Sequence, residues 1–289
     1  MASLRQIRRR IRSTQSTKQV MRAMQLVSGS KFKRAQSRLV QGRQMLEFLD
    51  GLLQRLLAAA PELTHPLMAS TPEAPGALLI VTSDAGLAGS YNANLIQLAE
   101  AELRRDTAVR TAVSYLGKRG HRYFTKRGYE AAEAYLDLAG RPDIAKIDAI
   151  GHTLLDRFLK GEVSAVKLLY AKFISATTSK PMIKQWLPIQ LATPTESAQS
   201  RAFPTEYIFE PSPQRVFEDL LPRWAIATFR LALLEAFTSE HGARMIAMKN
   251  ATDNAQELLT GLTMQRNRIR QASITRELSE IVGTAEALK

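Results

Sequence analysis

Cysteine is absent from the 289-residue sequence, and proline is absent from both of its ends. Without cysteine the chain has no disulfide, no thiolate ligand for a metal and no cysteine nucleophile. Carboxylates are scarce at the start, where the first acid is Glu47. Apolar runs such as LLQRLLAAA and ALLIV stay far below the roughly 20 residues that a membrane-spanning helix needs.

All twelve prolines lie between Pro61 and Pro222. Because proline breaks helix interiors, each end of the chain is free to form a long helix. Proline-rich stretches separate these ends from the middle. We therefore expect four segments, which are a long N-terminal helix at 1–60, a linker at 61–76, an α/β domain at 77–209 and a long C-terminal helix at 210–289.

The N-terminal segment carries an apolar heptad period. Alternating steps of three and four residues reach Leu4, Ile7, Ile11, Thr14, Lys18, Met21, Gln25, Ser28, Phe32, Ala35, Leu39, Gly42, Leu46, Leu49, Leu53 and Leu56. Most of these positions are apolar, which predicts the seam of a coiled coil. The seam weakens between Thr14 and Ser28, where Val20, Met24 and Val27 form an offset apolar row. There we expect the helix to change partner or to face something polar.

A second heptad period covers the C-terminal segment. It passes through Phe217, Leu220, Trp224, Ala227, Leu231, Leu234, Thr238, His241, Met245, Met248, Thr252, Ala255, Leu259 and Leu262. Beyond Leu262 the seam is lost, although helix-forming residues continue. Two seams in one chain most simply pair with each other, so we predict an antiparallel two-helix coiled coil. The C-terminal helix then runs past the start of its partner.

The positive charge is concentrated at the N-terminus. The formal net charge is +13, and residues 1–57 hold 13 Lys or Arg against 2 acids. A transit peptide, a nucleic-acid-binding arm and the solvated face of a coiled coil all fit this composition. The apolar period runs unbroken to Leu56, which disfavours a transit peptide. Phe32 and Phe48 lie at or beside the seam, so the segment offers little for stacking on bases.

The middle of the chain alternates between strand and helix patterns. We expect a buried strand, a turn and a helix within 77–103, and a second strand at 111–117 before a helical stretch. A weak strand near Glu130–Leu136 and a helix near Asp143–Phe158 follow. Two strands within 164–191 are joined by a turn at Thr177–Pro181. This order predicts a partly parallel, Rossmann-like α/β domain.

The loop from Ser83 to Ser90 lies between the first strand and its helix, as phosphate-binding loops do. It matches neither GxGxxG nor GxxxxGK[ST], however, and no lysine follows it. We interpret it as a tight turn in which Gly86 and Gly89 adopt unusual backbone angles and Ser90 or Asn92 caps the helix. A nucleotide-using α/β enzyme with helical arms stays an alternative, which binding of ATP or NAD would support.

No catalytic constellation emerges from the sequence. The four histidines are His65, His121, His152 and His241, and none has a carboxylate at metal-ligand spacing. His241 falls on the C-terminal seam, where a packed side chain is the simpler interpretation. No serine lies in a GxSxG elbow. We therefore assign no catalytic, cofactor-binding or metal-binding residues and expect no cofactor.

Both ends of the sequence resemble the gamma subunit of F-type ATP synthases. The first match is IRRRIRSTQSTKQVMRAMQLVSGSKFKRAQ, and the most specific ones are RMIAMKNATDNA and RQASITRELSEIVGTAEAL. TSDAGLAGSYNANL resembles the family's central-domain turn, and YIFEPSP its return strand. Together these matches cover the chain from end to end.

This resemblance implies a rotor. The paired helices would be a shaft inside a hexamer of alternating alpha and beta subunits. The α/β domain would be the foot, standing with the epsilon subunit on the membrane ring of c subunits. Catalysis would belong to the beta subunits, and nucleic acid would not be a partner. The chain would lie on the cytoplasmic face of a prokaryotic inner membrane, associated with the membrane only through the complex.

The resemblance also implies roles for single residues. Arg270 and Gln271 match a pair that holds a beta-subunit loop, and Met24 matches a position facing the acidic beta-subunit lever. Tyr207 and Glu210 match the strand that touches the c ring. The apolar bearing of the hexamer would receive the tail residues Leu278, Ile281, Val282, Ala285 and Leu288.

Some positions depart from the family pattern. Ala85 stands where many members have arginine, and Ser28-Gly29 stands where two alanines are common. Gly42 and Gly51 add two more glycines to the N-terminal helix. Glycine costs roughly 1 kcal/mol relative to alanine inside a helix, so we expect a softer shaft here.

Overall fold

The structure, a computed structural model, describes residues 4–69, 73–105, 111–138, 140, 143–190 and 209–287, with only the backbone for 285–287. The chain forms two compact units. One combines 1–28 with 244–289, and the other spans 29–243. Two long helices, α1 (Leu4–Ala59) and α6 (Pro213–Ala287), contribute to both units. No helix of the described part is long and apolar enough to cross a membrane.

The unit of 29–243 contains a five-stranded sheet in the order β3-β2-β1-β4-β5. Its strands are β1 (Gly76–Val81), β2 (Ala112–Leu116), β3 (Glu133–Tyr135), β4 (Ala165–Phe173) and β5 (Ser179–Leu187). The first four strands run parallel, and β5 pairs antiparallel with β4. The predicted partly parallel α/β domain is confirmed.

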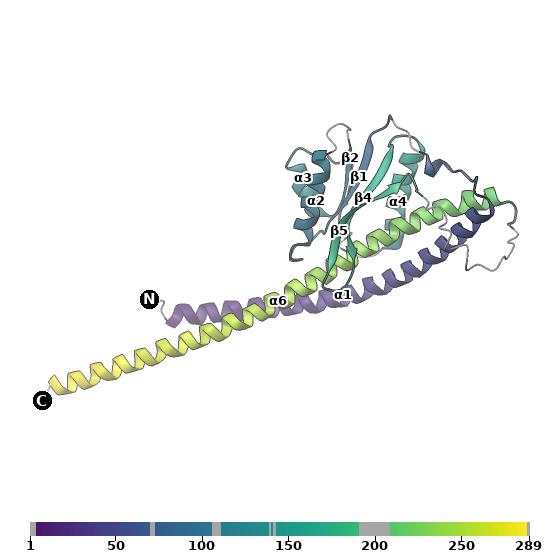
Figure 1. Cartoon of the computed structure of the whole chain (residues 1–289). Helices are drawn as coiled ribbons and strands as arrows, with labels where there is room; N and C mark the ends of the chain where they lie inside the picture. The colour runs from purple at the N-terminus through teal and green to yellow at the C-terminus, as the bar shows by residue number, and fades with distance from the viewer. Residues whose placement is uncertain are drawn as a thin grey trace. The chain divides into compact units, whose positions relative to one another are not determined.

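Helices cover both faces of this sheet (Figure 1). One face packs against α2 (Tyr91–Arg105) and α3 (Lys118–Thr125). The other packs against α4 (Ile144–Leu159), the 3-10 helix η1 (Pro66–Met68) and α6. Strand β1 is apolar without interruption because Leu78 and Ile80 face α2 while Leu79 and Val81 face α4 and α6.

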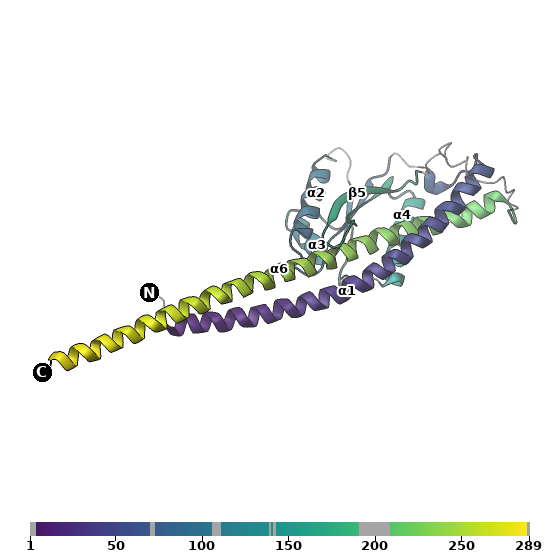
Figure 2. The same ribbon diagram turned by 60° about the horizontal axis from the view of Figure 1, so that its bottom comes forward.

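Within this unit α1 and α6 lie side by side and antiparallel, in Figure 1 and in the turned view of Figure 2. A Cβ at Gly42 of α1 would lie 3.3 Å from Leu234 Cδ1 of α6. In the same unit, Phe32 of α1 lies beside Gly242 of α6. These contacts confirm the predicted antiparallel pairing.

The predicted seams are the buried faces of both helices. Every position predicted for the seam of α1, from Leu4 to Leu56, is buried or half-buried, and the same holds for α6 from Phe217 to Leu262. Within the offset row, Val20 and Val27 are more than half exposed and Met24 is half-buried. The row therefore lies outside the seam, as its spacing predicts.

Two details of these elements involve proline, and one of them, the turn between β4 and β5, differs from expectation. Helix α6 begins at Pro213 and continues through Pro222, because Leu221 and Ala225 are fully buried and tertiary packing outweighs one lost backbone hydrogen bond. The turn between β4 and β5 closes at Ser175–Thr178 rather than at Pro181. Pro181 lies inside β5, an edge strand, where a missing donor is tolerated.

The loop after β1 is a tight turn, with different residues in the special roles. Leu87 and Gly89 have positive φ values of 62° and 57°, whereas Gly86 does not. Gly86 is instead short of space, because a Cβ there would lie 2.2 Å from Arg119 Nη2. Asn92 does not cap α2. Its Oδ1 accepts a hydrogen bond from the Ser83 backbone N–H at 3.0 Å and so ties the loop to the helix.

Candidate functional site

The end of α6 is the most exposed helical surface of the unit formed by 1–28 and 244–289. Lys18 Nζ of α1 donates a hydrogen bond to Gln256 Oε1 of α6, so these two residues lie level along the antiparallel helices. Counted from this pair at equal rise, Arg270 lies level with Leu4. The last turns of α6 extend beyond the first turn of α1 in both Figure 1 and Figure 2. The predicted overrun of the C-terminal helix is confirmed.

Apolar side chains follow one face of this end. Ile274, Leu278, Ile281 and Val282 are 48%, 58%, 64% and 58% exposed. Their spacing of four, three and one residues places them on one side of a helix. A contiguous exposed apolar face marks an interaction surface. Of the other tail positions predicted, Ala285 belongs to α6 without a described side chain, and Leu288 lies outside the described residues.

The residues predicted to contact a beta subunit are accessible. Arg270 and Gln271 are both exposed on α6, near the level where α1 begins. Met24 is half-buried on α1, one turn from the exposed Val20 and Val27. All three belong to the same unit of the chain. Glu210, predicted to contact the c ring, is exposed just before α6, and Tyr207 lies outside the described residues.

The basic N-terminal segment belongs to the folded coiled coil. Arg8, Arg9 and Arg12 are exposed, while the preceding seam residue Ile7 is 1% exposed. The cations therefore lie on the solvated face, as the coiled-coil interpretation of the charge predicted.

Three buried donors join the α/β domain to α6 in the unit of 29–243. Trp186 Nε1 on β5 donates to the Ala225 carbonyl at 2.9 Å. Tyr91 Oη on α2 donates to the Ala236 carbonyl at 3.1 Å. Ser239 Oγ on α6 donates to the carbonyl of Ala171 on β4 at 3.1 Å. Buried hydrogen bonds of this kind fix the rotation of one element against another.

Charged groups strengthen the same junction. Arg230 of α6 binds Asp148 of α4 with two hydrogen bonds of 2.8 and 2.7 Å, the fork geometry that makes such pairs strong. Arg43 Nη2 of α1 lies 2.8 Å from Glu235 Oε1 of α6. Burial, and then Glu235, raise the pKa of Tyr170, and burial lowers the pKa of Lys184. Glu235 thus interacts with Arg43 of α1 and with Tyr170 of β4.

Sequence reasoning missed this junction. Its one visible signal was Glu235, a single acid within the apolar run LALLEAF, because an isolated acid on a buried helix face needs a partner. No signal identified Arg43 as the partner of Glu235, or Asp148 as the partner of Arg230, since both contacts join residues far apart in sequence.

The histidines hold structural positions. His241 is 2% exposed, and its Nε2 lies 2.8 Å from the Gly140 carbonyl. This confirms a packed seam residue. His65 Nδ1 accepts the backbone N–H of Leu67 at 3.0 Å and so caps η1. Among the described residues, no group of three or more His, Asp or Glu side chains is placed to hold a metal ion.

Comparisons with known proteins cover the whole chain. The sequence profile of the ATP synthase family matches residues 3–288. The ATP synthase gamma chain of Moorella thermoacetica is 40% identical over 289 residues, which is 100% of both chains. The gamma chain of Symbiobacterium thermophilum is 40% identical over 285 residues, covering 98% of this chain and 97% of its own length.

Solved structures share the fold. A chain of the Euglena gracilis mitochondrial ATP synthase, in an OSCP/F1/c-ring structure, has a TM-score of 0.67 and 17% identity, covering 99% of this chain and 94% of that one. A chain of the Tetrahymena thermophila central stalk and c ring has a TM-score of 0.59 and 22% identity, covering 80% and 99%.

Proposed function

The chain belongs to the family of ATP synthase gamma chains, and we propose that it works as the central-stalk rotor of an F-type enzyme. In this proposal the coiled coil of α1 and α6 turns inside a hexamer of alternating alpha and beta subunits. The α/β domain stands with the epsilon subunit on the membrane c ring. Ion flow through the ring turns the shaft, and the turning shaft drives ATP synthesis on the beta subunits.

The observation that carries the proposal is the exposed end of α6. It stays helical to Ala287 although its described side chains are all exposed from Ile274 on. A helical end without a packing partner is only marginally stable in water, and an exposed apolar face on it lowers the solubility of the chain. A hydrophobic bearing in the hexamer would bury Leu278, Ile281 and Val282 while still permitting rotation, because apolar contacts are non-directional.

Polar contacts would bind the coiled coil to the beta subunits. Arg270 offers a planar fork of donors and Gln271 offers an amide, both exposed and free to hold a loop of a beta subunit. On α1, Met24 between Val20 and Val27 would meet the beta-subunit lever. At the foot, Glu210 and Tyr207 would touch the polar loops of the c ring.

Torque would pass between foot and shaft through the junction at α6. Arg230 joins α6 to Asp148 of α4, while Arg43 joins α1 to Glu235 of α6 and to the Phe173 carbonyl of β4. A rotor needs such a fixed junction, because a domain that slipped on its helix would dissipate the rotation. The ATP chemistry in this proposal takes place on the beta subunits and not on this chain. The complex would hold the chain on the cytoplasmic face of a prokaryotic inner membrane.

Reconstitution with alpha and beta subunits tests the proposal. The chain is mixed with alpha and beta subunits of a bacterial relative, and the mixture is passed over a sizing column while ATPase activity is measured. We expect one large complex that hydrolyses ATP, which the chain alone does not. Failure to form a complex, together with retention of the chain on DNA, would favour a nucleic-acid-binding coiled coil instead.

A further inference from the structure

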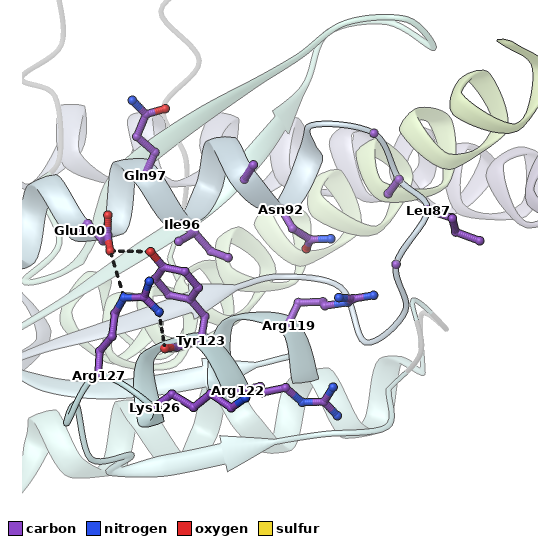
Figure 3. A pocket seen from close by; sticks show the side chains of 14 residues that line it. Leu87, Asn92, Ile96, Gln97, Glu100, Arg119, Arg122, Tyr123, Lys126 and Arg127 are labelled. Atoms are coloured by element: carbon purple, nitrogen blue, oxygen red, sulfur yellow. Dashed lines mark hydrogen bonds and ion pairs between the residues drawn. The ribbon is translucent and has the colours of Figure 1, made fainter. Parts of the chain in front are cut away.

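A cleft of about 620 Å³ lies between α2 and α3 in the unit of 29–243. At one end is the loop from Gly86 to Gly89, and at the other are Glu100 and Arg127. Figure 3 shows Arg119 beside this loop, with Arg122 and Lys126 farther along α3. The volume is within the range of pockets that hold small molecules.

The charge of this cleft is strongly unbalanced. Its charged lining is one carboxylate, Glu100, and four cations, Arg119, Arg122, Lys126 and Arg127. Glu100 is already engaged by the Tyr123 hydroxyl at 2.7 Å and by Arg127 at 3.7 Å. The Arg127 guanidinium also lies 3.6 Å from the centre of the Tyr123 ring. The other three cationic side chains have no counter-ion among the residues that the structure describes.

These three cations form a row. Arg119, Arg122 and Lys126 are spaced by three and four residues, which places them on one face of α3 and its C-cap. Like charges at this spacing repel one another. On a convex surface water would screen the repulsion, but here the row borders a concave wall that includes Leu87 and Ile96. Such a surface focuses the positive potential, and an anion in the cleft would relieve the repulsion.

The position of Arg119 suits a phosphate. Gly86 leaves room for the guanidinium, since a Cβ there would lie 2.2 Å from Nη2. Arg119 is thereby held against the loop that leads into α2, whose first turn also lines the cleft through Asn92 and Ala93. Guanidinium forks match phosphate oxygens, and the start of a helix adds partial positive charge. The case for a phosphate site therefore depends on the three cations of α3 and its C-cap. It does not depend on the glycine pattern of the loop, which matches no phosphate-binding motif.

We propose that the cleft between α2 and α3 binds the phosphate chain of a small ligand, either a nucleoside polyphosphate or inorganic polyphosphate. Arg119 and Arg122 hold the phosphate oxygens, and Lys126 adds charge at the mouth. A nucleoside, where the ligand has one, lies against the apolar wall at Ile96. This site belongs to the isolated chain and does not rest on its role as a rotor.

Binding to the full-length chain tests the site, with ATP and tripolyphosphate as the probes in equilibrium dialysis. The double variant Arg119→Ala with Arg122→Ala removes two cations from the cleft. Its matched control, Arg104→Ala with Arg105→Ala, removes the same charge from the exposed last turn of α2. We expect the cleft variant to weaken the binding of both probes at least about tenfold, because it loses charge-assisted hydrogen bonds to phosphate. The control variant should bind both probes with nearly the affinity of the parent chain.

The relative affinities of the two probes distinguish the two kinds of ligand. Equal affinity for the two probes identifies the phosphate chain alone as the ligand, and tighter binding of ATP identifies a nucleoside polyphosphate. Equal weakening by both double variants would overturn the proposal, because binding would then follow net charge. Absence of binding by both probes would overturn it too. So would tighter binding of a glutamate peptide of equal charge, since the cleft would then be a protein-docking surface.

Discussion

The guanidinium of Arg43 on α1 donates a hydrogen bond to the carboxylate of Glu235 on α6, with Nη2 2.8 Å from Oε1. The Glu235 side chain is 7% exposed and that of Arg43 is 42% exposed. The same Arg43 nitrogen reaches the carbonyl of Phe173 on β4 at 3.4 Å. One side chain thus connects both long helices and the sheet.

Removing Arg43 should destabilise the unit of 29–243. Arg43→Ala leaves a buried carboxylate without its cation, and the half-exposed arginine limits the loss to about 1–3 kcal/mol of unfolding free energy. Urea unfolding of the full chain measures this. The control Lys33→Ala removes an exposed cation from the same helix and should change stability by less than about 0.5 kcal/mol. Equal effects of the two variants would show that the ion pair contributes nothing.

Acid should weaken the cap of η1. Burial lowers the pKa of His65 below 6.5, and Glu218 opposes this only in part. The unfolded chain therefore binds the proton more readily, so the stability due to neutral His65 is present above pH 6.5 and is lost as the pH falls below it. We expect His65→Asn, which keeps an acceptor for the Leu67 N–H but cannot titrate, to flatten the pH dependence of unfolding between neutral and mildly acidic pH. An unchanged slope would contradict this.

Two glycines of α1 should respond differently to replacement by alanine. Nothing lies within 4 Å of a Cβ at Gly51, whereas a Cβ at Gly42 would lie 3.3 Å from Leu234. Gly51→Ala should therefore raise the free energy of unfolding by up to about 1 kcal/mol, through helix propensity alone. Gly42→Ala should gain less or lose stability, because the side chain of Leu234 must shift to make room for the methyl group. A larger gain at Gly42 than at Gly51 would contradict the close packing.

Two buried tyrosines form a matched pair. The Tyr115 hydroxyl has no hydrogen-bond partner within the described part of the chain, and burial raises its pKa to about 12. Tyr115→Phe should leave stability unchanged or raise it by about 1 kcal/mol, whereas Tyr91→Phe, which loses the bond to Ala236, should cost about 1 kcal/mol. Thermal unfolding distinguishes them. A clear loss in Tyr115→Phe would mean that its hydroxyl is satisfied.

Arg270 and Gln271 should affect coupling without affecting folding. Both side chains are exposed, so replacing both with alanine should shift unfolding by less than about 0.5 kcal/mol. In the assembled enzyme the double variant should pump fewer protons for each ATP hydrolysed, because the shaft would lose its hold on a beta-subunit loop. Proton pumping equal to that of the parent enzyme would remove these residues from the proposed contact.

The coiled coil and the sheet were predictable because both rest on local periodicity. The heptad seams and the continuous apolar strand β1 are visible in the sequence, and each maps onto a buried face. The passage of helix α6 through Pro222 was predictable for the same reason, because its heptad seam continues from Leu220 to Trp224 across this proline.

The junction was not predictable for a different reason. Arg43 and Glu235 are 192 positions apart, and periodicity says nothing about which distant side chains meet. The same holds for the cleft, where α2 and α3 supply opposite walls. Gly86 shows the limit most clearly. A glycine was expected at this position to allow an unusual backbone angle. In the structure its lack of a side chain instead leaves room for the guanidinium of Arg119.

Rotation itself tests the central claim most directly. Because the chain has no cysteine, Lys160→Cys on the exposed end of α4 provides a single attachment point for a bead on the foot domain. The variant is assembled with surface-fixed alpha and beta subunits, and the bead is observed by microscopy in ATP. The rotor account predicts sustained turning in one direction that stops when ATP is removed. A firmly assembled, hydrolysing complex whose bead never turns would contradict it.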